Sequence, residues 1–405
     1  MAVSTCVCPY CYHTIAISRP AYRCGGQGNG IKEPCKKGPD EQRERATGVK
    51  VPVLPSFLPP PDISPVKGQV ICPKCAGKTG TRVCPVCHTP LPSGLGDTAS
   101  PLIGMVGAKG TGKTVFMTVL LHQLQNGVAR RYGASVDIVG DTPDGLRSAA
   151  TAWMADFERP LFTDRSMIQQ TAQAKDAGRQ PPFVVQWRQP RRVLFFDRTK
   201  TMALSFYDQS GEDLTRQDSV NAHHYLAAAG GLMVLLDPLQ LPGVRDVVTV
   251  PENATVTDAE PPISVLTRVT EMLRSSHGVP VRKKVQVPLA VIFAKVDALF
   301  PVLGEHHPIR QVSGNGNGNG RGRDGAADGA EVHEYVRSLL HKWGADNVDA
   351  HLRLNYSTFR YFAVSALGAP PVGGKLAPGD IRPLRVDEPL IWLMKTLRLL
   401  GAAVA

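Results

Sequence analysis

The segment 107–114 constrains the fold of this 405-residue chain most strongly. It reads Gly-Ala-Lys-Gly-Thr-Gly-Lys-Thr and matches the pattern G-x-x-x-x-G-K-[ST] at every fixed position. We expect an apolar strand before it, at 102–106, and an apolar helix after it, at 115–124. A strand, a glycine-rich turn and a helix N-terminus together direct backbone N–H groups toward phosphate. This segment is therefore predicted to hold the phosphates of a nucleotide.

Each position of the loop has an expected contact. Lys113 is expected to reach the β- and γ-phosphates, and Thr114 is expected to ligate Mg²⁺. The predicted nucleotide-contacting residues are Gly107, Ala108, Lys109, Gly110, Thr111, Gly112, Lys113, Thr114 and Val115. A phosphate-binding loop alone does not distinguish GTP from ATP, so the base must be identified from other motifs.

A second motif follows two strand candidates at 192–196 and 201–207, which we expect to be joined by a hairpin turn at 197–200. The second strand leads into Asp208-Gln-Ser-Gly211. Asp208 is expected to hold Mg²⁺ through water, and the N–H of Gly211 is expected to meet the γ-phosphate. The D-x-x-G shape after a strand therefore predicts a phosphate-sensing segment.

Two further residues belong to the predicted hydrolytic machinery. Glu212 stands where a side chain could orient the attacking water, although its charge would face the γ-phosphate. This predicts slow hydrolysis, or hydrolysis helped by an Arg from a partner. Thr171 is the expected switch threonine that completes the Mg²⁺ coordination, with Thr163 as the alternative.

A third motif follows the apolar strand expected at 287–293 and reads Ala294-Lys-Val-Asp297. The Asp297 carboxylate could accept two hydrogen bonds from the N1–H and N2 amino groups of guanine, a pair that adenine does not offer. The stem of Lys295 is expected to pack over the base. After another strand, at 361–364, the loop residues Ser365, Ala366 and Leu367 are expected to back the base.

The order of these motifs resembles that of Ras-like, translation-factor-class P-loop GTPases. Within this class, the run 107–122 and the ending 385–393 resemble the bacterial double-GTPase type 2 proteins, whose GTPase domain often follows a Cys-rich zinc module. The resemblance implies a Mg²⁺-dependent GTPase switch that acts with partner proteins in a bacterial multi-gene system, such as one of conflict or defence. Ala294 stands where these GTPases usually have Asn or Thr. This departure predicts weaker affinity for the nucleotide or a softer preference for guanine, and it leaves ATP as an alternative ligand.

All nine cysteines lie in the first 87 residues, and six of them form three C-x-x-C pairs. This density in a chain without secretory features predicts metal binding rather than disulfides. Two zinc sites are expected, one formed by Cys72, Cys75, Cys84 and Cys87 and the other by Cys8, Cys11, Cys24 and Cys35. His13 as a substitute ligand, an interleaved pairing and an iron–sulfur cluster remain open. A site with four thiolates has no free coordination position, so its expected role is structural.

The expected architecture is α/β. A Cys-rich zinc-ribbon-like module at 1–92 and a linker at 93–100 precede a three-layer P-loop domain at 101–405 with a mostly parallel sheet. This domain is expected to contain a flexible Gly/Asn-rich insertion at 304–330, followed by a helix. The hydrophobic share of 42% supplies a sizeable core and excludes a wholly disordered chain.

The net charge is +11, and residues 1–100 contribute 12 Lys/Arg against 6 Asp/Glu. No apolar run is long enough to span a bilayer and no secretory signal is visible, so we expect a cytoplasmic protein. Protein partners are expected at the zinc module or at the switch segments. A nucleotide-gated module that binds nucleic acid through the basic zinc ribbon, and a P-loop ATPase, are the alternatives.

Overall fold

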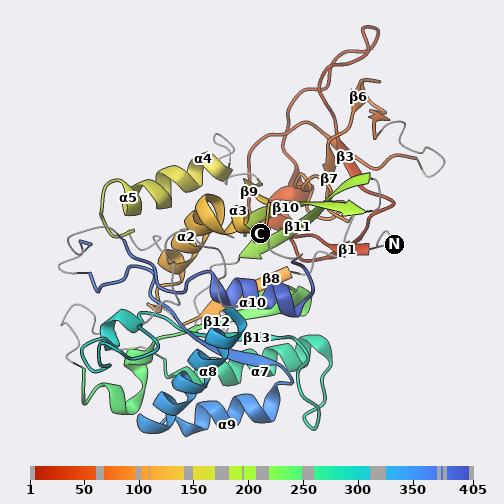
Figure 1. The fold of residues 1–405 in the computed structure, drawn as a ribbon. Helices are drawn as coiled ribbons and strands as arrows, with labels where there is room; N and C mark the ends of the chain where they lie inside the picture. Colours follow the sequence, from red (N-terminus) through yellow and green to blue (C-terminus); the bar gives the residue numbers. More distant parts are fainter. Residues whose placement is uncertain are drawn as a thin grey trace. The chain divides into compact units, whose positions relative to one another are not determined.

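The computed structural model divides the chain into two compact units, which are described separately (Figure 1). The described residues are 5–60, 68–96, 102–108, 110–140, 149–168, 182–193, 196–206, 219–248, 260–310, 325–371, 375–376 and 381–400. Unit 1 comprises Met1–Leu102, Ser135–Ala155 and Gln170–Phe206, and unit 2 comprises Ile103–Ala134, Asp156–Gln169 and Tyr207–Ala405. Unit 1 thus contains, besides the Cys-rich segment, most of the chain between the phosphate-binding loop and the D-x-x-G motif.

A four-stranded sheet forms the centre of unit 2. Its strands are β8 (Leu102–Gly107), β12 (Ala229–Leu236), β13 (Leu289–Phe293) and β14 (Phe359–Ala363), in the order β14-β13-β12-β8. β12, β13 and β14 pair in parallel. Apolar runs without alternation are typical of strands buried on both faces, and every residue of β8 and β13 is buried. The predicted parallel sheet is confirmed for these strands.

Helices accompany this sheet, and Figure 1 shows α7, α8 and α9 grouped on one side of β12 and β13. The longer helices of unit 2 are α2 (Lys113–Gln123), α6 (Ser219–Ala228), α7 (Pro262–His277), α8 (Gly325–Lys342), α9 (Asp346–Asn355) and α10 (Glu388–Thr396). α8 begins inside the segment 304–330 that was expected to be a flexible insertion. Of that segment, residues 311–324 lie outside the described residues.

Short helical segments complete this part of the chain. They are η1 (Leu124–Val128), α3 (Ala129–Arg131), η2 (Met154–Glu158), α5 (Arg159–Phe162), η4 (Pro238–Gln240), η5 (Pro242–Val244) and η7 (Val296–Leu299). Two of them, η4 and η7, follow directly on the strands β12 and β13, so the chain turns sharply at the carboxyl edge of the parallel sheet.

Unit 1 contains a three-stranded antiparallel sheet in the order β11-β10-β9. Its strands are β9 (Ser135–Val139), β10 (Phe183–Val193) and β11 (Phe196–Phe206). The hairpin turn predicted at 197–200 is wrong, because these residues pair in the ladder with residues 189–192. Of the run Asp-Arg-Thr-Lys only Asp is a common turn residue, and Thr favours a strand.

The Cys-rich part of unit 1 consists of short elements. They are β1 (Thr5–Val7), β2 (Thr14–Ala16), β3 (Ala21–Arg23), α1 (Glu41–Thr47), β4 (Ser56–Phe57), β5 (Val70–Ile71), β6 (Lys78–Thr79) and β7 (Arg82–Val83), and α4 (Ala149–Trp153) belongs to the same unit. These strands form small sheets, with β3 between β4 and β7. Elements this short cannot build a large core, which is why such segments need metal ions or other cross-links.

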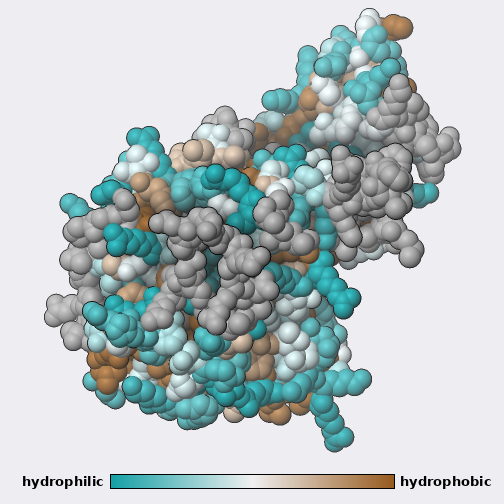
Figure 2. Space-filling model, viewed as in Figure 1, coloured by the Kyte–Doolittle hydropathy of each residue, from teal (hydrophilic) through white to brown (hydrophobic). Residues whose placement is uncertain are grey.

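The surface of the described part is mostly hydrophilic on the face drawn in Figure 2, where apolar residues form small separate groups. Within the described residues, no helix has the length and apolar character needed to cross a membrane. The most exposed large apolar side chains include Ile31 and Val281, at 91% and 86% exposure.

A glycine pair tests the packing of α6 on β8. A methyl group on Gly104 would lie 2.7 Å from Leu232 Cδ1 and 2.9 Å from the Tyr225 hydroxyl, whereas one on Gly127 meets nothing within 4 Å. We expect Gly104→Ala to lower the free energy of unfolding by about 1–3 kcal/mol, because the added methyl group would clash with Leu232 and Tyr225 in the core. Gly127→Ala should be neutral or stabilising by up to about 1 kcal/mol. Thermal unfolding of both variants checks this, and equal midpoints would contradict the packing described.

Candidate functional site

The predicted phosphate-binding loop lies between β8, which ends at Gly107, and α2, which begins at Lys113, as the sequence motif predicts. Gly110 and Gly112 adopt φ values of 78° and 84°, which glycine reaches without the steric cost other residues incur. The buried Lys113 donates from Nζ to the carbonyls of Gly107 and Ala108, at 3.0 and 2.9 Å. Its ammonium group therefore lies inside the loop, where a phosphate oxygen could replace these carbonyls as acceptor.

The loop that follows β13 carries the predicted base-reading residues. Asp297 is buried, with 8% exposure, and burial raises the pKa of its carboxyl group, while a hydrogen bond with Ser365 lowers it. Ser365 is fully buried and its Oγ also accepts the N–H of Gly368 at 2.8 Å. The structure thus brings together the K-x-D motif and the Ser365–Leu367 loop, which lie at the ends of adjacent parallel strands.

Lys295, in the loop after β13, contacts the loop after β8 and the loop after β12. Its Nζ donates to the Gly110 carbonyl at 2.6 Å and to Asp237 Oδ2 at 2.7 Å. The buried carboxylate of Asp237 follows β12 and also accepts the N–H of Leu239 at 3.0 Å. Sequence reasoning missed Asp237 because it read these residues only as the end of a strand; an Asp at the carboxyl end of an apolar run was the available signal.

Several predicted residues lie outside the described part of the chain. These are Lys109, Thr171, Asp208, Gly211 and Glu212. Thr163, the alternative to Thr171, is described and exposed, directly after α5. The roles of these residues stay predictions.

The cysteines form two clusters, each with four sulfur atoms within 4.8 Å of one another. One contains Cys8, Cys11, Cys84 and Cys87, and the other contains Cys24, Cys35, Cys72 and Cys75. The sequential pairing predicted from the spacing is therefore wrong, and the interleaved pairing is the one observed. His13 is in neither cluster; its Nδ1 lies 2.9 Å from the Cys11 carbonyl oxygen.

The antiparallel pairing of β3 with β7 explains the interleaving. Ala21 lies opposite Val83 and Tyr22 lies opposite Arg82. Cys24 follows β3 and Cys84 follows β7, so these two residues lie at opposite ends of the strand pair. Cys24 and Cys84 are thereby directed to different clusters.

The donor sets fit tetrahedral zinc. Four sulfurs at about 2.3 Å from one ion are about 3.8 Å apart. Sγ atoms of Cys8 and Cys87, and of Cys11 and Cys84, are 3.8 Å apart, and those of Cys24 and Cys75 are 3.4 Å apart. These separations are too long for a disulfide bond, and all nine thiols are free. Each cluster could therefore hold one zinc ion, although iron–sulfur ligation also uses four thiolates.

The three C-x-x-C turns share one backbone geometry. In each turn the carbonyl of the first cysteine accepts an N–H from four residues later at 2.9 Å, and that residue is left-handed: Tyr12, Ala76 and His88. The Gly77 N–H lowers the pKa of Cys75 to about 6, whereas burial raises the pKa of Cys8 well above its ordinary value. Because zinc binds thiolates, an ion in the first cluster must displace protons.

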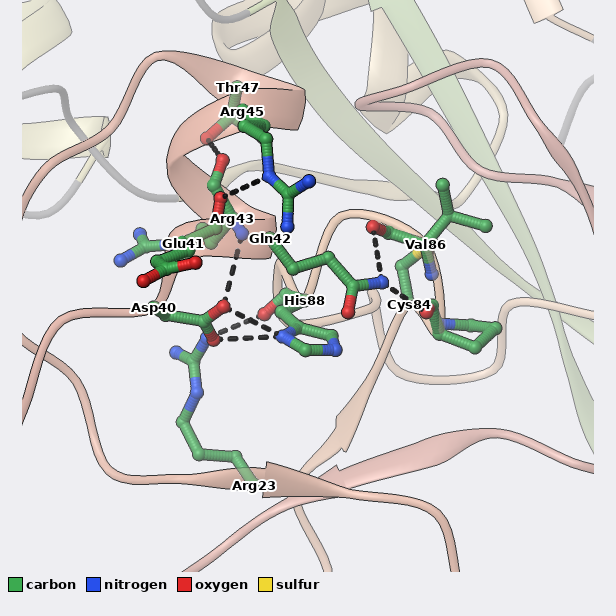
Figure 3. Close-up of polar contacts among 11 residues, drawn as sticks. Arg23, Asp40, Glu41, Gln42, Arg43, Arg45, Thr47, Cys84, Val86 and His88 are labelled. Carbon is green, nitrogen blue, oxygen red and sulfur yellow. Dashed lines mark hydrogen bonds and ion pairs between the residues drawn. The ribbon is translucent and has the colours of Figure 1, made fainter.

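A polar network supports the third cysteine turn (Figure 3). Asp40 caps α1 by accepting the Arg43 N–H at 3.0 Å, and its carboxylate binds Nδ1 of His88 at 2.8 Å. Gln42 donates to the carbonyls of Pro85 and Val86, both at 2.9 Å. His88, next to Cys87, is thus held by a carboxylate rather than placed among the ligands. Asp40 was missed in the sequence, where an Asp before a helix is a capping signal.

The first cluster is part of a core that includes the antiparallel sheet. Its four cysteines pack with Tyr10 and with Val184 of β10 and Ala203 of β11. The Ser205 hydroxyl donates to the Pro9 carbonyl at 2.8 Å. Fewer apolar side chains pack around the second cluster, where Leu54 and Phe57 contact its cysteines. Disruption of the first cluster should therefore disturb unit 1 more than disruption of the second cluster.

Comparison with known proteins shows a relative in sequence. No family model matches the chain. The chain is 30% identical over 353 residues to a Mycolicibacterium smegmatis protein described as "Putative ESX-1 scaffolding and assembly protein SaeC". This match covers 83% of this chain and 83% of the relative.

Similar solved structures include three GTPase-related proteins. The signal recognition particle receptor SRb-GTP/SRX complex of Chaetomium thermophilum is 12% identical, with 68% of this chain and 95% of that chain covered and a TM-score of 0.29. A bacterial selenocysteine-specific elongation factor, EF-Sec, is 12% identical, with 75% and 30% covered and a TM-score of 0.25. The Saccharomyces cerevisiae Ski7 GTPase-like domain bound to GTP is 7% identical, with 75% and 52% covered and a TM-score of 0.28.

Paired substitutions test the interleaved clusters. Cys8→Ser/Cys87→Ser removes two ligands from one cluster, so the purified protein should keep one zinc ion per chain. Cys8→Ser/Cys24→Ser damages both clusters and should leave none after dialysis against a chelator. A sequential pairing predicts the reverse result, because Cys8 and Cys24 would then share one site.

Metal analysis by mass spectrometry, with circular dichroism to monitor folding, distinguishes these outcomes. Cys6→Ser is the matched control, since Cys6 belongs to neither cluster and the variant should keep two zinc ions. Iron with visible absorbance in place of zinc would contradict the assignment of the metal.

Proposed function

The chain belongs to the family of the mycobacterial SaeC protein, and on that premise we propose that it is a Mg²⁺-dependent GTP-binding and GTP-hydrolysing switch. The observation that carries the proposal is the position of Lys113 and Asp297, one in a glycine-rich loop at a helix N-terminus and the other buried on the loop after β13. Lys295 joins the two loops by its hydrogen bond to Gly110. The bond supports the proposal that a phosphate site and a base-reading carboxylate would lie on connected loops.

On the phosphate side, Lys113 would exchange its bonds to the Gly107 and Ala108 carbonyls for bonds to phosphate oxygens. The N–H groups at the start of α2 would add a favourable dipole. Thr114 and Asp208 would hold Mg²⁺, which neutralises the charge that develops on the phosphates. Gly211 would sense the γ-phosphate, with Glu212 beside the attacking water and Thr171 as the switch threonine.

On the base side, Asp297 would accept the guanine N1–H and N2 amino groups with its two carboxylate oxygens. Ser365, Ala366 and Leu367 would back the base. The hydrogen bond between Ser365 and Asp297 supports this role, because it fixes the carboxylate and favours its ionised form. Burial opposes ionisation of Asp297, so hydrogen bonds donated by guanine would further stabilise the charged carboxylate.

The partner of the switch is proposed to be a protein. The relative is described as a scaffolding and assembly protein, a role in which a nucleotide-dependent change of partner affinity has an evident use. The zinc-bound module of unit 1 would carry the docking surface, in the cytoplasm of a bacterium. The resemblance to double-GTPase type 2 proteins is compatible with this role and extends the proposal to a multi-gene system.

Nucleotide selectivity tests the proposal. We expect wild-type protein with Mg²⁺ to bind a fluorescent GTP analogue in preference to the ATP analogue. Asp297→Asn should weaken GTP binding by about tenfold or more and shift the preference toward xanthosine triphosphate. The reason is that Asn replaces one of the two charged acceptor oxygens with an NH2 donor, which matches the oxygen of xanthine at position 2. Lys113→Ala should weaken binding of every triphosphate.

Fluorescence titration gives the affinities, and Asp246→Asn is the control for a change of charge at an exposed position of the same unit. If ATP binds as well as GTP and Asp297→Asn has no effect, the guanine proposal is wrong and a P-loop ATPase takes its place. Salt-dependent binding of nucleic acid that changes with nucleotide would instead support the nucleic-acid-binding alternative.

A further inference from the structure

Asp237 occupies an unusual position among the loops at the carboxyl edge of the parallel sheet. It directly follows β12, only 6% exposed, and caps η4 through the Oδ1 bond to the Leu239 N–H. Its other oxygen, Oδ2, accepts the Lys295 ammonium group at 2.7 Å. A carboxylate this buried is retained only where a cation and hydrogen bonds compensate its desolvation, and Asp237 has both.

Lys295 is held in a conformation that it would not adopt freely. Its φ is 53°, in the left-handed region that costs most residues other than glycine free energy. From there its Nζ reaches both Asp237 and the Gly110 carbonyl, which lies in the phosphate-binding loop. One ammonium group therefore joins three loops: those after β8, β12 and β13.

Ala294 has no polar side-chain group that could connect its loop to another. The residue usual at this position in the GTPases that the chain resembles ties its loop to the phosphate-binding loop through a side-chain hydrogen bond. The methyl group of Ala294 cannot do so, and its N–H is already donated to the Leu236 carbonyl at 3.0 Å. The bond from Lys295 to Gly110 supplies a connection between the same two loops.

We propose that Asp237 is a positioning residue of the nucleotide site, which directs Lys295 onto the phosphate-binding loop and thereby slows nucleotide release. Asp237 acts through Lys295 and touches neither the base nor the phosphates. The inference rests on the proposed nucleotide-binding function. Ala294 alone predicts weaker nucleotide affinity or a softer guanine preference, and the contact from Lys295 to Gly110 would offset part of that loss.

Dissociation kinetics test the inference. Asp237→Asn keeps the side-chain shape and the capping oxygen but removes the charge. We expect fluorescent GTP and GDP analogues to dissociate about tenfold faster than from wild type, which corresponds to the loss of one charged hydrogen bond. The preference for guanine over xanthine should stay unchanged, because Asp297 still reads the base. Lys295→Met should accelerate release similarly, and the double variant should add no further increase.

A second measurement does not depend on nucleotide. In the nucleotide-free protein, amide hydrogen exchange at 110–113 should be faster in Asp237→Asn and Lys295→Met than in wild type. Asp349→Asn is the matched control, because Asp349 is also buried and paired with a cation, Arg353, at 2.7 Å, in α9. It should change neither the release rate nor the exchange at 110–113.

The outcomes separate the inference from the proposed function. If wild type binds neither nucleotide, the proposed function fails, while hydrogen exchange still decides whether Asp237 and Lys295 hold the loop. Unchanged release and unchanged exchange in Asp237→Asn would overturn the inference. So would additive effects in the double variant, or a change in base preference like that of Asp297→Asn.

Discussion

The parallel ladder of β12, β13 and β14 is the constraint on which the candidate nucleotide site depends. In its register Leu236 pairs with Phe293, and Phe293 pairs with Ala363, so the three strands end at the same level. The residues that follow must therefore emerge at one edge of the sheet. The hydrogen-bonded register of the three strands therefore fixes the relative positions of the loops that follow them.

This constraint explains which parts of the site the sequence could predict. A chemical motif directly after an apolar strand can be placed, since parallel strands end at a common edge; this holds for Lys295, Asp297 and Ser365. The part played by Asp237 could not be predicted, because it depends on which loop faces it in three dimensions. A single Asp-Pro after a strand is also an ordinary way to start a helical turn.

The pairing of the cysteines and the position of the antiparallel hairpin could not be predicted from the sequence. The C-x-x-C spacing identifies ligands but not partners, since the partners are set by the direction of β3 relative to β7. The hairpin register is likewise set by pairing along β10 and β11, whose turn has no strong local signal. The assignment of strands 135–139 and 183–206 to the cysteine-containing unit depends on long-range packing of Val184 and Ala203, which periodicity does not reveal.

The contact of Ser205 with Pro9 has an evolutionary consequence. Ser205 is the second-last residue of β11, and Ala203 of the same strand packs in the core of the first cysteine cluster. Side chains alternate between the faces of a strand, so inserting or deleting one residue between Ala203 and Ser205 would turn one of them away from that core. Homologous chains should therefore keep the spacing between these two residues of β11 and vary in length outside the strand.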